Sequence, residues 1–237
     1  MSRRRVIVAV LAGVLGFALT VALGNWQTRR AQYKLGLQAQ WDAAQRAAPL
    51  VVNAATLREV AAHMPVRVRL TGHFDHRYSV WLDNRQNHGR PGFYVITPFL
   101  TDGDAVLIAR GWVARDPQER LRLPAVGEPA GVLTIEGLAV PELPRLLELG
   151  APDESRRWPR VWQNLDFAAY EHASGLAVAR FVVQQTSQSD DELARDWPPP
   201  DLGVDMHRGY ALQWYSLAAL IAGLTLYFGW RGLRTAQ

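Results

Sequence analysis

Six histidines carry the most versatile chemistry in this chain: His63, His73, His76, His88, His172 and His207. His207 lies three residues before an uncharged apolar run, Tyr210 to Trp230. If Asp205 caps a helix at this point, His207 belongs to the first helical turn. The positive end of the helix dipole then favours the neutral imidazole, which is the form that binds haem iron as an axial ligand.

Helical spacing adds an aromatic and apolar face to this candidate ligand. The face would hold His207, Tyr210, Trp214 and Leu217. A flat apolar macrocycle can lie against such a face, and its carboxylates would reach three interfacial arginines: Arg29, Arg30 and Arg208. The alternative is that His207 only hydrogen-bonds lipid headgroups. The physical argument from these residues, taken alone, favours that alternative.

The remaining motifs point to no enzyme. His73 and His76 flank Asp75, but no third metal ligand is evident nearby and no zinc-hydrolase helix pattern occurs, so solvated turn residues are the better interpretation. The chain has no Gly-x-Ser-x-Gly elbow and no phosphate-binding loop. Arg110-Gly111-Trp112 and Gly89-Arg90-Pro91-Gly92 have turn residues at strand ends, and their arginines would face a ligand or a partner only in a weaker, alternative interpretation.

Two apolar runs must position His207. The first extends from Val6 to Leu23 and the second from Tyr210 to Trp230. At about 1.5 Å per residue, helices of this length reach across a hydrocarbon core of about 30 Å. A cleaved signal peptide is the alternative for the first run, but an apolar stretch of 18 residues is longer than usual for one. We therefore expect a membrane protein with two transmembrane helices.

The charges predict how this protein lies in the membrane. Arginines flank each run on the side nearer the chain terminus: Arg3, Arg4, Arg5, Arg231 and Arg234. Arg-rich ends tend to stay in the cytoplasm, so both termini are expected there, with the central domain in the periplasm. Residues 25–209 carry 21 basic and 22 acidic side chains. This balance argues against nucleic acid and leaves membrane lipid as the partner of the basic tails.

The segment between the runs is expected to fold as one α+β domain without disulfides, since the chain has no cysteine. Alternating apolar residues predict strands near 66–70, 78–83, 93–100, 105–109, 132–138 and 181–186, with a hairpin turn at 102–104 and a short helix at 166–173. Such a domain is mainly antiparallel, and a partly closed barrel is one arrangement open to it.

The expected domain boundaries follow from these patterns. Residues 1–24 form the tail and first transmembrane helix, and 25–186 the external domain, in which 25–48 extend the first helix. Residues 187–206 form an acidic, proline-rich linker, 207–230 the second transmembrane helix and 231–237 a cytoplasmic tail.

In their order along the chain, these features resemble the surfeit locus protein 1 family, whose members are assembly factors for cytochrome c oxidase. The resemblance rests on a series of short motifs: Gly24-Asn25-Trp26-Gln27, Val68 to Phe74, Leu82-Asp83-Asn84-Arg85, Pro91 to Pro98, Arg110-Gly111-Trp112-Val113 and His207 to Tyr215. Each motif is modest, but their order between two terminal membrane helices is specific. A bacterial member of the family is expected.

The resemblance implies a non-enzymatic role in maturing the haem–copper oxidase at the bacterial plasma membrane. It implies haem a as a transient cofactor, with His207 as its axial ligand, and as partners the oxidase catalytic subunit and the haem a synthesis machinery. One alternative is a scaffold that stabilises the nascent subunit without binding haem. Another, with no motif to support it, is a membrane-anchored periplasmic enzyme.

Overall fold

In the computed structural model, the chain divides into two units. The structure describes residues 3–53, 55–119, 122–147, 160–198 and 202–234. One unit is helical and comprises residues 1–39 and 201–237, and the other comprises residues 40–200. The elements of the first unit are α1 (Arg3–Arg46), whose last turns belong to the second unit, and α4 (Val204–Arg234).

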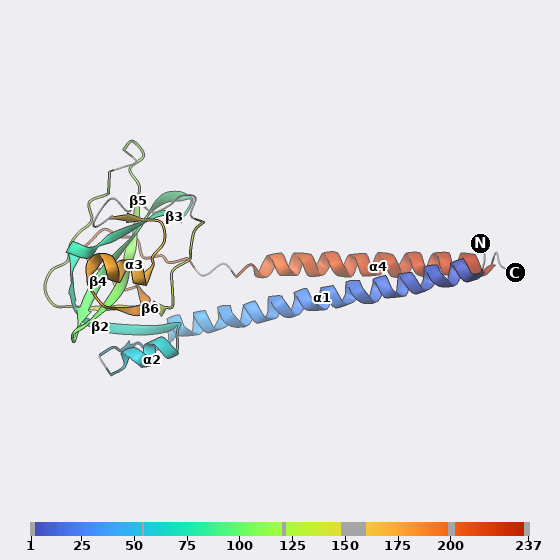
Figure 1. Cartoon of the computed structure of the whole chain (residues 1–237), viewed down its shortest axis with the longest axis horizontal. Helices are drawn as coiled ribbons and strands as arrows, with labels where there is room; N and C mark the ends of the chain where they lie inside the picture. Colours follow the sequence, from blue (N-terminus) through green and yellow to red (C-terminus); the bar gives the residue numbers. More distant parts are fainter. Residues whose placement is uncertain (1–2, 54, 120–121, 148–159, 199–201, 235–237) are drawn as a thin grey trace. The chain divides into compact units, whose positions relative to one another are not determined.

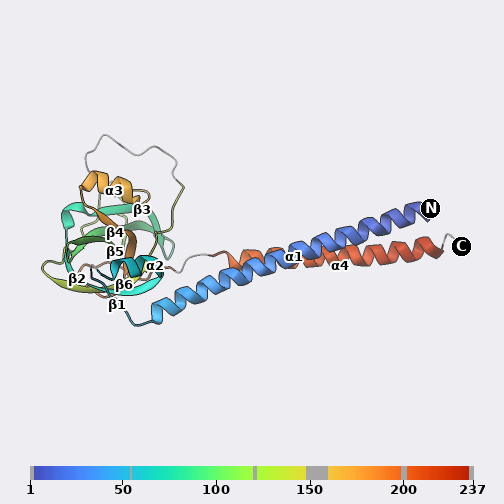
Figure 2. The ribbon, with the colours of Figure 1, turned by 60° about the horizontal axis from the view of Figure 1, so that its bottom comes forward.

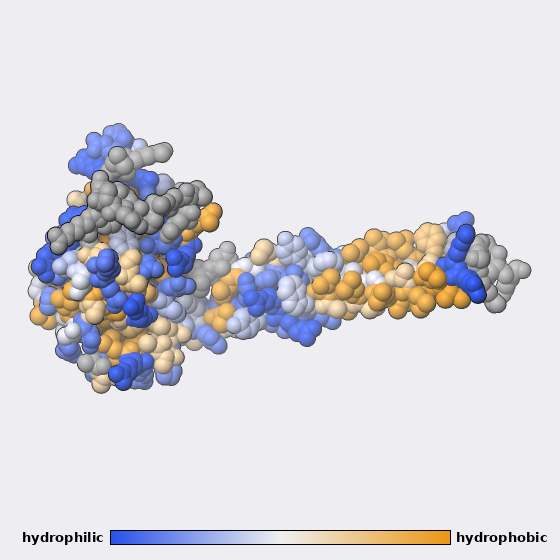
Figure 3. Space-filling model, in the orientation of Figure 1, coloured by the Kyte–Doolittle hydropathy of each residue, from blue (hydrophilic) through white to orange (hydrophobic). Residues whose placement is uncertain are grey.

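The helical unit is built from the two apolar runs, and α1 and α4 lie side by side in both ribbon views (Figures 1 and 2). Both helices are long and apolar enough to cross a membrane, judged by length and composition. Apolar side chains cover the visible face of the pair toward the chain ends, and hydrophilic side chains follow beyond them (Figure 3). Of the predicted tail, residues 235–237 lie outside the described part of the chain.

The second unit is mostly β, as expected. Its elements are β1 (Leu50–Val51), α2 (Leu57–Ala62), β2 (Val66–Phe74), η1 (His76–Tyr78), β3 (Val80–Asn87), β4 (Arg90–Thr101), β5 (Asp104–Ala114), β6 (Leu133–Val140), β7 (Val161–Trp162), α3 (Phe167–Ser174) and β8 (Val178–Gln185).

The described strands form one sheet in the order β1-β2-β6-β8-β5-β4-β3-β7. Pairing is antiparallel except between β1 and β2, β3 and β7, and β5 and β8. Strand β2 also pairs with β4, through His73 with Leu100 and Phe74 with Phe99. This second pairing joins the two ends of the run β2-β6-β8-β5-β4 at these two residue pairs.

Local signals explain where several elements begin and end. Asp166 accepts a hydrogen bond from the amide of Ala169 and so caps α3, which ends at Gly175 in the left-handed conformation. Asp102 and Gly103 both have positive φ and join β4 to β5, which is the geometry of a two-residue hairpin turn.

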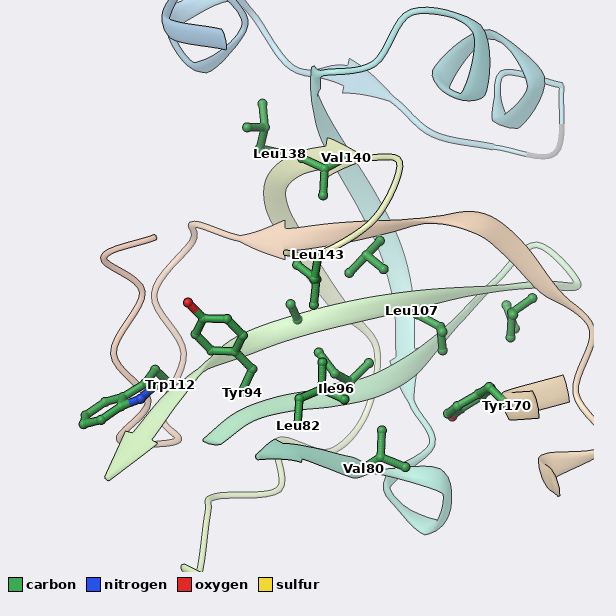
Figure 4. Packing of buried hydrophobic residues seen from close by; sticks show 14 residues of the cluster. Val80, Leu82, Tyr94, Ile96, Leu107, Trp112, Leu138, Val140, Leu143 and Tyr170 are labelled. Carbon is green, nitrogen blue, oxygen red and sulfur yellow. The ribbon is translucent and has the colours of Figure 1, made fainter. Parts of the chain in front are cut away.

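The sheet is covered on both faces, which explains why β4 and β5 are almost continuously buried. The helix α3 contributes Tyr170 to a cluster that also holds Leu82, Ile96 and Leu107 (Figure 4). The helix α2 contributes Val60 to a second cluster. On β5, neighbouring Leu107 and Ile108 belong to different clusters because successive side chains point to opposite faces.

The segment expected to be a linker lacks a helix or multi-residue strand up to residue 198, yet part of it packs on the strands. Leu193 is buried, and Ala194 exchanges backbone hydrogen bonds with Trp112 of β5. The indole of Trp197 donates to the carbonyl of Gln185. These contacts make residues 191–197 part of the β domain. Pro199 and Pro200 of the expected linker lie outside the described residues.

Candidate functional site

His207 lies in the first turn of α4, and its partner comes from α1. The amide of His207 donates to the carbonyl of Gly203 and closes that turn. Asp205 is the second residue of the helix rather than its cap, because α4 already begins at Val204. The imidazole Nδ1 lies 2.7 Å from Oε1 of Gln27, which is buried on α1.

The hydrogen bond to Gln27 decides which ring nitrogen of His207 is available. A glutamine Oε1 can only accept, so Nδ1 carries the proton and Nε2 keeps its lone pair. No described residue forms a hydrogen bond with Nε2. Histidines that bind metals usually donate their other ring N–H to an oxygen acceptor. The donor set at His207 therefore fits the axial imidazole that haem iron takes.

The aromatic residues predicted beside His207 remain accessible on α4. Tyr210 is 46% exposed, and Trp214 is partly exposed. The three predicted arginines are exposed as well, with only light engagement. Arg208 lies 3.6 Å from the carboxylate of Asp205, Arg29 donates weakly to the backbone of α1, and Arg30 lies over the ring of Tyr33. Their guanidinium groups stay free enough to bind an anionic group.

A second polar layer joins the helices about two turns further along α4. The Tyr215 hydroxyl donates to Oδ1 of Asn25 at 2.8 Å and lies 3.2 Å from Oγ1 of Thr28. The Tyr215 ring packs against Gly24, where an added Cβ would come within 2.6 Å of it. The sequence motif that begins at Gly24 thus meets the motif that begins at His207.

Asn25 and Gln27 belong to a motif noted in the sequence, but no role was predicted for either residue. Their helical register is the signal that could have found them. Gly24, Gln27 and Ala31 follow the spacing of one helix face, and all three are buried. A polar side chain on an otherwise small and apolar interface needs a partner on the facing helix.

The small residues that bring the helices together differ partly from those that their spacing in the sequence predicts. Spacing by four predicts Ala12, Gly16, Thr20 and Gly24 on α1 and Ala219 and Gly223 on α4. Thr20 and Gly24 are buried, but Ala12 and Ala219 are exposed and a Cβ on Gly223 would meet nothing within 4 Å. The close approach uses Gly13 and Ala218 instead: a Cβ on Gly13 would clash with the Thr225 side chain, and Ala218 is buried.

The β domain adds no metal site among its described residues. No group of three or more His, Asp or Glu side chains in that part of the chain could hold a metal ion. Nε2 of His76 contacts the carbonyl of Pro129 at 3.0 Å, and His73 remains exposed. His73 is thus an exposed residue of strand β2 and His76 a partly buried residue of η1, so neither is the solvated turn residue that was expected.

Arg110 does not face a ligand, contrary to the weaker interpretation of its motif. Its side chain is 1% exposed and donates to Asp191 and to the carbonyl of Gly127. Arg195 donates to both oxygens of Asp191, whose side chain is fully buried. Burial lowers the pKa of the Arg110 guanidinium, and the charge of Asp191 opposes this shift. The arrangement fastens residues 191–195 to β5.

Comparison with known proteins gives one consistent family. A model of the SURF1 family matches residues 14–219. The SURF1-like protein of Rickettsia bellii is 26% identical over 220 residues, 88% of this chain and 86% of that protein. Human Surfeit locus protein 1 is 27% identical over 226 residues, 83% of this chain and 69% of the human protein. The Saccharomyces cerevisiae cytochrome oxidase assembly protein SHY1 is 33% identical over 97 residues, 40% of this chain and 25% of the yeast protein.

Proposed function

The chain belongs to the SURF1 family, and we propose on that basis that it is an assembly factor for cytochrome c oxidase that holds haem a at His207 for insertion into the catalytic subunit. The similarity to the yeast cytochrome oxidase assembly protein SHY1 supports the first part. The geometry of His207 supports the second, since its Nε2 is unpartnered among the described residues and its Nδ1 is fixed by Gln27.

The residues around His207 have separate roles in this proposal. Haem a, when bound, supplies an iron that takes an imidazole nitrogen as ligand. Tyr210 and Trp214 offer an apolar surface to the macrocycle, and Arg208, Arg29 and Arg30 pair with its carboxylates. The protein carries out no bond-making chemistry of its own, so the role is that of a carrier and not of an enzyme.

The two helices support a membrane location for this function. Both are long and apolar enough to span, and arginines flank their outer ends. We propose that both termini lie in the cytoplasm and the β domain in the periplasm of a bacterial inner membrane. Haem a made within the membrane would then reach His207 from the haem a synthesis machinery and pass to the oxidase catalytic subunit. A reporter that is active only in the periplasm should stay silent when fused after residue 237.

The function is tested by a reduced-minus-oxidised spectrum of membranes from a strain that lacks this gene. We expect the haem a oxidase signal to fall, and to return with the wild-type gene but not with His207→Ala. His63→Ala is the matched control, because His63 is an exposed histidine of the β domain. That variant should restore the signal fully.

Two other results would contradict parts of the proposal. Full restoration by His207→Ala would retain oxidase assembly but replace haem binding with scaffolding, in which the protein only stabilises the nascent subunit. An unchanged haem a signal in the deletion strain, with no second copy of the gene, would remove the assembly function.

A further inference from the structure

The contact between Gln27 and His207 joins residues 180 positions apart in the sequence and decides the state of the imidazole. We propose that Gln27 is a positioning residue that holds His207 as its Nδ1–H tautomer, so that Nε2 is the atom offered to the ligand. The part of this inference that concerns haem a rests on the proposed function. The part that concerns the tautomer does not.

The tautomer argument starts from the chemistry of the free side chain. A neutral histidine in water prefers to carry its proton on Nε2, which leaves Nδ1 as the acceptor. The tautomer in a protein is set by the hydrogen bond that one nitrogen makes. At 2.7 Å, Oε1 of Gln27 accepts a hydrogen bond of ordinary length. The contact with Gln27 therefore reverses the intrinsic preference and leaves Nε2 of His207 without a proton.

The surroundings of Gln27 hold its amide in place. Gln27 is 8% exposed and lies between Gly24 and Ala31 on the buried face of α1, and Gly24 packs against Tyr215 of α4. A side chain packed in this way has little freedom to turn away from His207. Because Gln27 and His207 belong to different helices, the imidazole is held as the Nδ1–H tautomer only when the two helices are paired.

Charge explains why an amide is suited to this position. Lys34 and Arg30 lie close enough to His207 to act on it electrostatically, so cationic groups are already present for an anionic ligand. An amide oxygen orients the imidazole without adding a carboxylate that would compete for those cations. Gln27→Glu would keep an acceptor in place and is therefore the conservative variant.

The first test needs no haem. Full-length protein with ¹⁵N-labelled histidine in detergent micelles is studied by NMR, and the His207 signals are assigned from their loss in His207→Ala. We expect the Nδ1–H pattern in the wild type and a shift toward the Nε2–H pattern in Gln27→Leu. Tyr215→Phe is the matched control: it removes a different hydrogen bond between the same helices and should leave the tautomer unchanged.

The second test adds haem a to the same proteins and follows its absorption spectrum. Loss of an outer partner of a metal ligand typically weakens binding by about 10- to 100-fold, and we expect this for Gln27→Leu. Gln27→Glu should retain the Nδ1–H pattern and lose less affinity than Gln27→Leu. Circular dichroism establishes that each variant keeps its helices.

The outcomes separate the two proposals. The role of Gln27 would be overturned if Gln27→Leu kept the Nδ1–H pattern. It would also be overturned if the wild-type protein itself showed the Nε2–H pattern. An Nδ1–H pattern that depends on Gln27, in a wild-type protein that binds no haem a, would support the positioning role and refute haem holding instead.

Discussion

Replacing Asp191 by alanine should be among the most damaging single changes in the β domain. The carboxylate lies between two guanidinium groups, and the side chains of all three residues are at most 4% exposed. Without it, Arg110 and Arg195 lose their shared counter-ion, and only the weaker effect of the Glu128 charge on Arg110 remains. Breaking a buried ion pair in this way costs about 3–5 kcal/mol of the free energy of unfolding.

Incomplete hydrogen bonding makes the cost higher rather than lower. Nε and Nη1 of Arg110 and Nε of Arg195 are buried and already lack a hydrogen-bond partner among the described residues. The Nη2 groups of Arg110 and Arg195 are the donors that lose the carboxylate, and the unpartnered N–H groups beside them indicate that the described part of the site holds no spare acceptor. For a domain of this size, the loss corresponds to a fall in Tm of about 6–20 °C.

The assay is denaturant unfolding of the full-length protein in detergent, followed by near-ultraviolet circular dichroism. Glu119→Ala is the control, because its pair with Arg122 at 3.9 Å is exposed and should contribute nothing measurable. A triple variant, R110M/D191L/R195M, separates charge from packing. It should be more stable than Asp191→Ala, since apolar side chains leave no buried charge unpaired.

Two results would refute this reasoning. A loss below about 1 kcal/mol in Asp191→Ala would mean that water reaches the arginines, contrary to their burial. A triple variant as unstable as Asp191→Ala would mean that shape, and not the unpaired charge, dominates at this position.

Two further predictions concern the helix pair and acid stability. Gly24→Val should displace the Tyr215 ring, which a Cβ would approach within 2.6 Å, and should lower cross-linking between cysteines introduced across the helix interface of this cysteine-free chain; Gly223→Val, with open space around it, should not. The hydrogen bond from Arg77 lowers the pKa of Asp75 in the folded protein. The ionised Asp75 carboxylate therefore contributes its full stabilisation above the unfolded pKa of about 3.9, and this stabilisation is lost as the pH falls through the lower pKa of the folded state. The free energy of unfolding should therefore depend less steeply on pH in the acid range in Asp75→Asn than in the wild type. Equal slopes for the two proteins would contradict this assignment.

Features that depend on neighbouring residues could be predicted from the sequence. Uncharged apolar runs determine two helices because hydropathy is a property of a short stretch of chain. Asp166 and Gly175 mark the ends of α3, and Asp102-Gly103 marks the turn between β4 and β5, because capping and positive φ depend on single residues. The order of motifs was enough to predict the family that the comparison found.

The candidate site was only half visible in the sequence. His207 was identified from its place before an apolar run, but its partner Gln27 was not. A hydrogen bond between two helices depends on how each is rotated about its own axis. Successive residues on a helix differ by about 100° in direction, so a one-residue error in the assumed face exchanges Ala218 for Ala219 and points the interface elsewhere.

By itself, the sequence determined that this protein has two long apolar helices around a mainly antiparallel β domain, because those features add up locally along the chain. The tertiary structure alone decided which side chains are paired. Asp191 was expected in an acidic, proline-rich linker and is buried between Arg110 and Arg195. Gln27 and His207 are brought together by helix packing. Such pairs depend on the three-dimensional approach of distant segments, which no local pattern encodes.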